Sequence, residues 1–150
     1  MEDSDLRRVI LSVLVLTGLS LAGLVPVHAA TPFRVIVHHE VKGEKISRGT
    51  LTSIFLKRAP KWTDGSVISP VDQSVRSEVR RSFSGDVLLQ AVAEVQIYWQ
   101  RRMSQGVVPP PVKATDQDVV AFVASTPGAI GYVSVVTPLP ESVKAIELAD

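Results

Sequence analysis

The chain of 150 residues contains no cysteine, and only 5% of its residues are aromatic. Without cysteine there can be no disulfide, no thiolate metal site and no cysteine nucleophile. Neither sign of charge predominates, since 16 Lys and Arg residues stand against 15 Asp and Glu residues. A near-neutral chain lacks the strongly basic surface of a dedicated nucleic-acid-binding domain, so no nucleic-acid partner is expected. The composition is otherwise that of a globular protein, with 45% hydrophobic and 21% charged residues.

An apolar run without charge extends from Val9 to Val25. Two arginines precede it, a proline follows it, and Val27-His28-Ala29 then offers small residues for cleavage. This order is typical of a secretory signal peptide, so residues 1–29 are predicted to be removed and residues 30–150 to form one domain. The alternative is an uncleaved membrane anchor, because a run of this length can just span roughly 30 Å of hydrocarbon. Both interpretations predict an exported domain, periplasmic or secreted, that contacts the membrane only through an uncleaved leader.

Short strands and helices alternate along the rest of the chain. Runs rich in β-branched residues predict strands over residues 33–38, 67–71, 129–133 and 143–148. Helices are predicted to begin at Ser47, Ser77 and Thr115, each of which is a residue type that caps helices, and a further helix is predicted over residues 86–103. This alternation predicts an α/β fold whose mixed, mainly parallel sheet is flanked by helices. Pro70 confines its strand to an edge of the sheet or to a strand end.

The predicted helix over residues 86–103 carries a clear apolar stripe. Leu88, Val92, Val95 and Trp99 recur at steps of three and four residues, and Tyr98 widens the stripe. These side chains are therefore predicted to belong to the core rather than to a ligand platform.

Three stretches occur in an order that resembles a known family. They are Leu51-Thr52-Ser53-Ile54-Phe55-Leu56, Ile68-Ser69-Pro70-Val71, and Thr126-Pro127-Gly128-Ala129-Ile130-Gly131-Tyr132-Val133. Together they resemble the phosphate-binding proteins of ABC-type phosphate uptake, which are members of the type 2 periplasmic binding protein superfamily. The resemblance covers roughly residues 33–135. Full-length family members have two α/β lobes that close on an anion and are more than twice this length, so the resemblance implies one such lobe here.

The family's phosphate loop reads Arg-Ser-Asp-Gly-Ser-Gly-Thr-Thr, and it falls on the stretch from Gln73 to Arg80. Ser74 and Ser77 are retained, and Ser77 matches the serine whose hydroxyl and neighbouring N–H groups hold phosphate at a helix N-terminus in the family. The family's arginine is replaced by Gln73, whereas Arg76 and Arg80 are absent from the family pattern and could restore positive charge. The resemblance thus implies an oxyanion site, most simply for phosphate, at these five residues.

Another interpretation of Ser77 is that it only caps its helix, with Glu78 placed favourably in the first turn. The pair His38-His39 does not predict a metal site, because adjacent residues of a strand point to opposite faces. No nucleophile–base pair can be recognised, so neither an enzyme nor a cofactor is predicted.

The sequence supports two hypotheses about function. The first is an exported solute-binding module for ABC-type uptake or sensing, with phosphate or a similar oxyanion as ligand and a permease or another envelope protein as partner. The alternative is a protein-interaction or sensory domain that retains the fold without a ligand.

Overall fold

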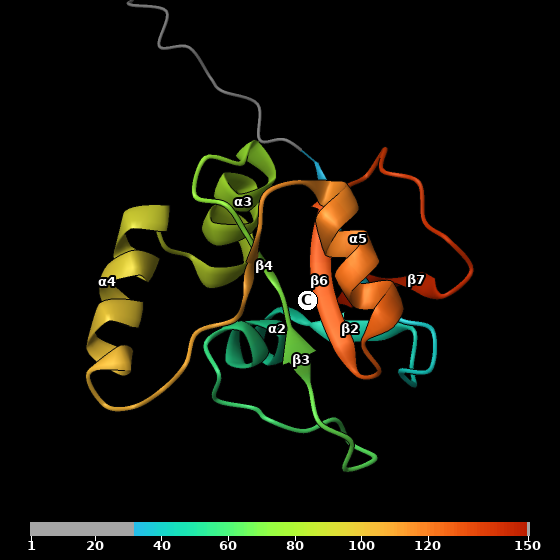
Figure 1. The fold of residues 1–150 in the computed structure, drawn as a ribbon, viewed down its shortest axis with the longest axis horizontal. Helices are drawn as coiled ribbons and strands as arrows, with labels where there is room; N and C mark the ends of the chain where they lie inside the picture. The colour runs from blue at the N-terminus through green and yellow to red at the C-terminus, as the bar shows by residue number, and fades with distance from the viewer. Residues whose placement is uncertain (1–31, 150) are drawn as a thin grey trace, which may run out of the picture.

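The computed structural model describes residues 32–149, and the predicted signal peptide lies outside this range (Figure 1). Within the range no helix is both long enough and apolar enough to cross a membrane. The elements in chain order are β1 (Phe33–His38), β2 (Lys45–Ser47), α2 (Arg48–Phe55), β3 (Ser69–Pro70), β4 (Asp72–Gln73), α3 (Glu78–Phe83), the π-helix η2 (Ser84–Leu88), α4 (Val92–Met103), β5 (Val112–Lys113), α5 (Asp116–Ser125), β6 (Ala129–Ser134) and β7 (Val143–Ala149).

Five strands form a mixed sheet in the order β2-β7-β1-β6-β3. The central strand β1 pairs antiparallel with both β6 and β7, whereas β2 pairs parallel with β7 and β3 pairs parallel with β6. The predicted α/β class with a mixed sheet is confirmed, but its longest pairings are antiparallel rather than mainly parallel. The reason is that β7 inserts between β1 and β2 instead of extending the sheet at an edge. Pro70 lies in the edge strand β3, as predicted.

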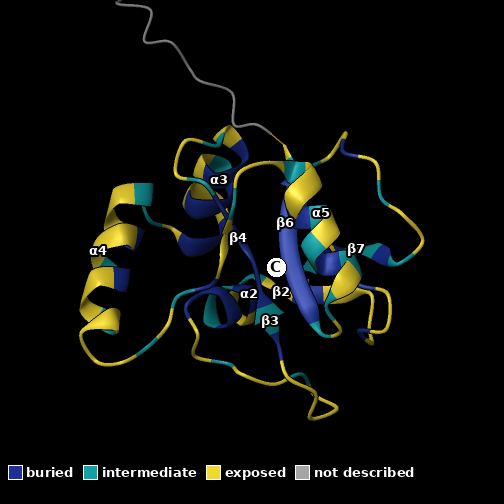
Figure 2. Cartoon of the chain, viewed as in Figure 1, coloured by how far each residue is buried: buried dark blue, intermediate teal, exposed yellow. Residues whose placement is uncertain are grey.

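Helices cover both faces of this sheet, and each face has its own apolar cluster. Ile36 of β1 packs in one cluster with Val119 and Val123 of α5. Its neighbours Val35 and Val37 belong to the other cluster, which includes residues of α2, α3, η2 and α4. This division follows from the alternation of side chains along a strand. Figure 2 shows β6 buried along almost all of its length between these layers.

The three predicted helix caps are confirmed. The hydroxyl oxygens of Ser47, Ser77 and Thr115 each accept a hydrogen bond from a backbone N–H three residues further along. Each such cap contributes about 1 kcal/mol to stability. The caps determine where α2, α3 and α5 begin, and of the predicted anion-site residues Ser77 caps α3 and Arg80 lies within it.

The prediction of one helix over residues 86–103 is wrong. Leu89, with φ of 52° and a side chain 81% exposed, interrupts it between η2 and α4. The helix α4 begins at Val92 with Ala91 as its N-cap, and the Glu94 carboxylate accepts a hydrogen bond from the Ala91 N–H at 2.7 Å. The apolar stripe gave no sign of this break, because Leu88 at the end of η2 and Val92 at the start of α4 keep the four-residue spacing of a single helix.

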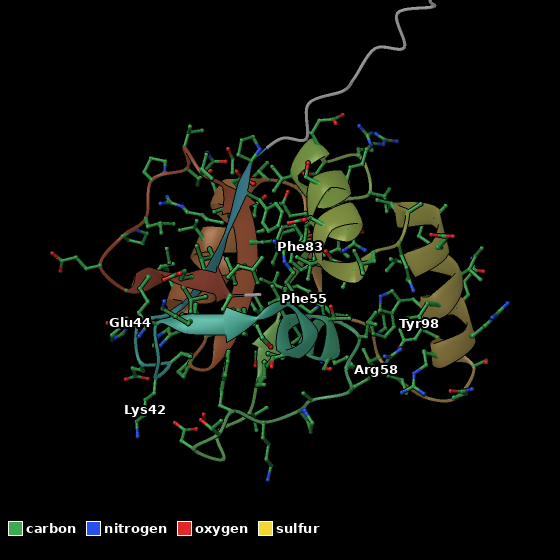
Figure 3. The ribbon with its side chains drawn as sticks, turned by 180° about the vertical axis from the view of Figure 1, so that it is seen from behind. Lys42, Glu44, Phe55, Arg58, Phe83 and Tyr98 are labelled. Atoms are coloured by element: carbon green, nitrogen blue, oxygen red, sulfur yellow. The ribbon has the colours of Figure 1, made fainter. Side chains whose placement is uncertain are left out.

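The core residues predicted for α4 are largely confirmed. Val95 and Trp99 are buried, whereas most of α4 is exposed (Figure 2). Tyr98 is half-buried, and its hydroxyl donates to the Leu56 carbonyl at 2.8 Å. The guanidinium of Arg58 lies 5.8 Å from the centre of the Tyr98 ring (Figure 3). These few side chains attach α4 to the body of the domain.

Candidate functional site

A cavity of about 280 Å³ lies between β4, α3, α4 and the segment that leads into β5. Hydrogen bonds of 2.9 Å from Asp72 N to the Pro111 carbonyl and from Ser74 N to the Lys113 carbonyl hold one wall together. The lining residues are Asp72, Gln73, Val75, Arg80, Gln96, Trp99, Gln100, Met103, Pro109, Pro110 and Val112. Three of them belong to the Gln73–Arg80 stretch that the sequence predicts to bind an oxyanion.

An ion pair between Arg80 and Asp72 lies in the wall of this cavity. Nη1 of Arg80 is 2.5 Å from Oδ1 of Asp72, and both side chains are more than nine-tenths buried. Burial raises the pKa of the Asp72 carboxyl, while the Arg80 charge and a hydrogen bond from Tyr132 act in the opposite direction. Nε of Arg80 is buried without a hydrogen-bond partner among the described residues. The arginine therefore has donor capacity that its partners in the protein do not use.

Tyr132 supports the ion pair from β6. Its hydroxyl donates to Asp72 Oδ1 and accepts from Arg80 Nη1 at 3.3 Å. Its ring stacks on Phe83, with ring centres 3.8 Å apart and planes 2° from parallel. Burial, followed by the nearby Asp72 charge, raises the pKa of Tyr132 well above its ordinary value of 10.0. The phenol is thus held in its neutral form by its surroundings.

This environment predicts an alkaline loss of stability. Above about pH 10 the unfolded chain ionises Tyr132 whereas the folded chain does not, so the free energy of unfolding falls as pH rises. The Tyr132→Phe variant should be less stable than the wild type at neutral pH but should lose less stability between about pH 9 and about pH 11. Urea unfolding at both pH values measures this difference, and an equal pH dependence in the two proteins would contradict it.

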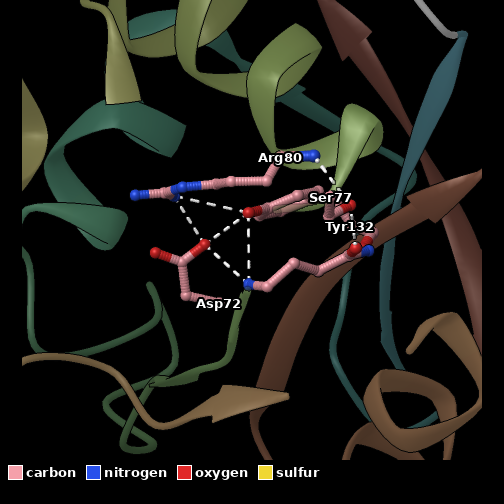
Figure 4. Close-up of polar contacts among 5 residues, drawn as sticks. Asp72, Ser77, Arg80 and Tyr132 are labelled. Atoms are coloured by element: carbon pink, nitrogen blue, oxygen red, sulfur yellow. Dashed lines mark hydrogen bonds and ion pairs between the residues drawn. The ribbon is translucent and has the colours of Figure 1, made fainter. Parts of the chain in front are cut away.

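Gln73 lines the cavity and forms a hydrogen-bond network with Ser77, which Figure 4 labels. The Ser77 hydroxyl donates to Gln73 Oε1 at 2.6 Å and accepts from the Arg80 N–H at 3.2 Å. The Gln73 amide nitrogen donates to Asp116 Oδ1 at 2.8 Å and to the Tyr132 carbonyl at 2.9 Å. Their polar side-chain atoms are therefore engaged within the protein, and both residues hold the start of α3 in place.

The other two predicted residues lie in the turn before α3. The Ser74 carbonyl accepts from the Ser77 N–H at 2.9 Å, and Ser74 Oγ accepts from the Arg76 N–H at 3.3 Å. Arg76 is exposed, in contrast to Arg80. The structure thus places Gln73, Ser77 and Arg80 in one hydrogen-bonded group, with Ser74 joined to it through backbone and Arg76 at the surface.

Sequence reasoning missed three residues of the site, namely Asp72, Trp99 as a lining residue, and Tyr132 as a hydrogen-bonding partner. One signal could have indicated Asp72, since it is a carboxylate between the apolar Val71 and the predicted loop. A charge at the buried end of a strand requires a partner of opposite charge.

Two other features lie outside this cavity. A larger hollow of about 620 Å³ beside β1 and β7 includes Phe33, Val35 and Ile146 but none of the predicted residues. The rings of His38 and His39 lie 4.4 Å apart because β1 ends at His38 and the chain turns there. Within residues 32–149, His, Asp and Glu side chains form no group of three that could hold a metal ion.

The comparisons with known proteins show similarity at the level of the fold. No family model matches the chain, and no curated protein matches it. Solved structures do match. An ABC-type phosphate transport receptor from Vibrio cholerae superposes with a TM-score of 0.61 at 18% identity, over 78% of this chain and 46% of the receptor. A Clostridium perfringens protein assigned as a phosphate ABC transporter substrate-binding protein, with bound phosphate, superposes with a TM-score of 0.63 at 17% identity. The match covers 78% of this chain and 44% of that protein.

PstS from Borrelia burgdorferi gives a TM-score of 0.61 at 15% identity, over 79% of this chain and 47% of PstS. The chain therefore spans just under half the length of these three structures. At such low identity the match establishes the fold alone, and it confirms the architecture that the sequence resemblance implies. The described domain has the fold of one part of the phosphate ABC transporter substrate-binding proteins.

Proposed function

We propose that this protein is an exported, non-enzymatic solute-binding module that holds a small oxyanion, most simply phosphate, in the cavity beside Asp72 and Arg80. The observation that carries the proposal is the buried guanidinium in the cavity wall. Arg80 is only 3% exposed, yet its Nε has no partner among the described residues. The terminal nitrogen Nη1 makes the contacts to Asp72 and to the Tyr132 hydroxyl that Figure 4 marks with dashed lines. Unused guanidinium donors suit an oxyanion, because they form strong charge-assisted hydrogen bonds.

Asp72 would decide which oxyanion is accepted. Its second carboxylate oxygen points to the same side as the second terminal nitrogen of Arg80 (Figure 4). An ionised carboxylate can only accept hydrogen bonds. An anion without a proton, such as sulfate, would be repelled by it, whereas hydrogen phosphate can donate its own P–OH. The pair therefore favours a tetrahedral oxyanion that carries a proton.

The five predicted residues take different roles in this proposal. Arg80 contacts the anion directly. Gln73 and Ser77 hold the first turn of α3 so that Arg80 keeps its position, and Ser74 stabilises the turn before it. Arg76, as an exposed cation, raises the local concentration of anions.

The cellular context of the proposal comes from the matched structures. The matched proteins are described as transport receptors or substrate-binding proteins for phosphate. By analogy, this module would act in ABC-type uptake or in sensing, outside the cytoplasm, and its partner would be a permease or another envelope protein.

A ligand-free interaction or sensory domain is the second candidate. It is favoured by the internal hydrogen bonds of Gln73 and Ser77, which leave neither the Ser77 hydroxyl proton nor the Gln73 amide for a ligand. Measurement of anion binding separates the two functions.

Isothermal calorimetry with sodium phosphate is expected to give a saturable binding isotherm, with weaker binding of sulfate. Phosphate at a hundred times its Kd should stabilise the folded protein by about 2.7 kcal/mol, which a thermal melt detects. Arg80→Lys should weaken phosphate binding, because an ammonium lacks the planar fork of the guanidinium. Arg81→Gln is the matched control, since Arg81 is the next residue of α3 and is exposed.

A third variant tests Ser77. If the serine is only a helix cap, Ser77→Ala lowers stability by about 1 kcal/mol whether or not phosphate is present. If it also holds the site in place, the stabilisation by phosphate shrinks as well. A wild-type protein that responds to neither anion at millimolar concentration would support the ligand-free alternative.

A further inference from the structure

We infer that the ligand of the cavity beside Asp72 and Arg80 is an organic oxyanion, namely a phosphonate or phosphate ester that carries an apolar group. Its anionic head would lie against Arg80, and its apolar group would lie against the remaining walls of the cavity. The inference rests on the proposed function, because it names the class of anion that the same site holds.

The cavity has one place for an anionic head. Among the described residues that line it, Asp72 and Arg80 are the charged ones, and they form a single buried ion pair. Nε of Arg80 is buried without a hydrogen-bond partner among the described residues. Gln73 also lines the cavity, but its amide nitrogen already donates to Asp116 and to the Tyr132 carbonyl. A singly protonated phosphonate matches the ion pair, because its oxygens accept from a guanidinium and its P–OH can donate to a carboxylate.

The rest of the cavity is mainly apolar. The apolar lining residues are Val75, Trp99, Met103, Pro109, Pro110 and Val112. Apart from the indole N–H of Trp99, their side chains have no strong hydrogen-bond donor for an anion. An inorganic ion in contact with these walls would lose hydration without a compensating hydrogen bond, which is unfavourable. An apolar group on the ligand gains free energy from the same contact, because it leaves water.

The size of the cavity also suits a ligand larger than inorganic phosphate. Its volume is about 280 Å³, close to the lower end of the roughly 300–1,000 Å³ of small-molecule sites. A water molecule takes up about 30 Å³ in the liquid, and a phosphate ion is the size of a few water molecules. Small-molecule sites are typically apolar with a few polar groups that fix the orientation of the ligand. The ion pair and the apolar walls divide this cavity in the same way.

Charges next to the cavity favour an anion over a neutral or cationic ligand. Arg76 is exposed and follows Val75, and the half-buried Lys113 follows Val112. Neither of the two cations is a lining residue of the cavity. They would therefore attract an anionic ligand from solution, while the apolar side chains that precede them contact its apolar group.

Isothermal calorimetry with inorganic phosphate, methylphosphonate and phenylphosphonate tests the inference. Phenylphosphonate should bind at least about tenfold more tightly than methylphosphonate, because its ring buries more apolar surface. Phenol has the ring without the anionic head and should bind more weakly than either phosphonate. Arg80→Lys should weaken the binding of both phosphonates, since they share the head that Arg80 holds.

A pair of variants on α4 locates the phenyl ring. Met103 lines the cavity and is 50% exposed, so Met103→Gln should leave the fold intact and make this wall polar. It should reduce the preference for phenylphosphonate over methylphosphonate severalfold. Ile97→Gln is the matched control, because Ile97 is 48% exposed on the same helix and does not line the cavity. It should keep the preference of the wild type.

The outcomes separate this inference from the proposed function. Binding of phosphate with equal affinities for the two phosphonates would overturn the inference and support the function. A preference for phenylphosphonate that Met103→Gln leaves unchanged, or that phenol shares, would also overturn it. Binding of phenylphosphonate without measurable binding of phosphate would support the inference and restrict the function to organic anions. A protein that binds none of the three anions would contradict both.

Discussion

Replacing Asp72 by alanine is expected to lower the free energy of unfolding by about 3–5 kcal/mol, because it leaves the Arg80 guanidinium buried without a counter-charge. The guanidinium would lose the 2.5 Å ion pair and, among its contacts with the described residues, would keep the 3.3 Å hydrogen bond to the Tyr132 hydroxyl. Equilibrium unfolding in urea measures the loss. A change below about 1 kcal/mol would show that water reaches the guanidinium and screens its charge.

A double variant provides the control for this prediction. Replacing a buried ion pair by apolar residues of similar size is often neutral or stabilising. Asp72→Leu combined with Arg80→Met should therefore recover most of the stability that Asp72→Ala loses. The same double variant should not bind phosphate, since neither the donor nor the acceptor of the proposed site remains. Stability and binding would thus respond separately, as expected if the pair is kept for its ligand rather than for the fold.

Truncating Trp99 to alanine is expected to cost about 3–5 kcal/mol, the range for removing a large buried aromatic side chain. Trp99 is 8% exposed, and it is the larger of the two buried side chains of α4, the other being Val95. Thermal or urea unfolding followed by circular dichroism measures the change. Because Trp99 also lines the cavity, its loss should weaken phosphate binding too.

Ile97 is the matched control on the same helix. It is 48% exposed, and Ile97→Ala should change stability by less than about 1 kcal/mol, as is usual for surface substitutions. If Trp99→Ala had an equally small effect, the packing of α4 would contribute little to the stability of the domain. The α4 wall of the cavity would then be only loosely held.

Local chemistry explains which elements could be predicted from the sequence. Ser47, Ser77 and Thr115 begin helices because their hydroxyls satisfy backbone donors nearby, and this depends only on residues three positions away. The break at Leu89 could not be predicted, since a leucine in the left-handed region has no signature in the sequence. Strand order also escaped prediction, because the insertion of β7 beside β1 depends on contacts between residues more than a hundred positions apart.

Only the part of the site whose residues are consecutive in the sequence could be predicted. The loop from Gln73 to Arg80 could be found because its residues are consecutive and resemble a known pattern. Their roles could not, because the Gln73 side chain donates to Asp116 at 2.8 Å and to the Tyr132 carbonyl, both distant in sequence, and in turn accepts from the Ser77 hydroxyl. Tyr132 lies fifty-two positions beyond Arg80, and nothing local indicates that its hydroxyl meets that guanidinium.

The position of β7 in the sheet has a consequence for the order of folding. The strand formed by the last described residues lies between the two formed by the first, so β1 and β2 have no sheet to join until β6 and β7 have been synthesised. Loop closure over such distances is entropically costly and makes folding slow. A chain that is synthesised from its N-terminus would therefore not form this sheet until β6 and β7 have followed. If the chain is exported as we propose, this delay would keep the sheet unformed while the polypeptide crosses the membrane.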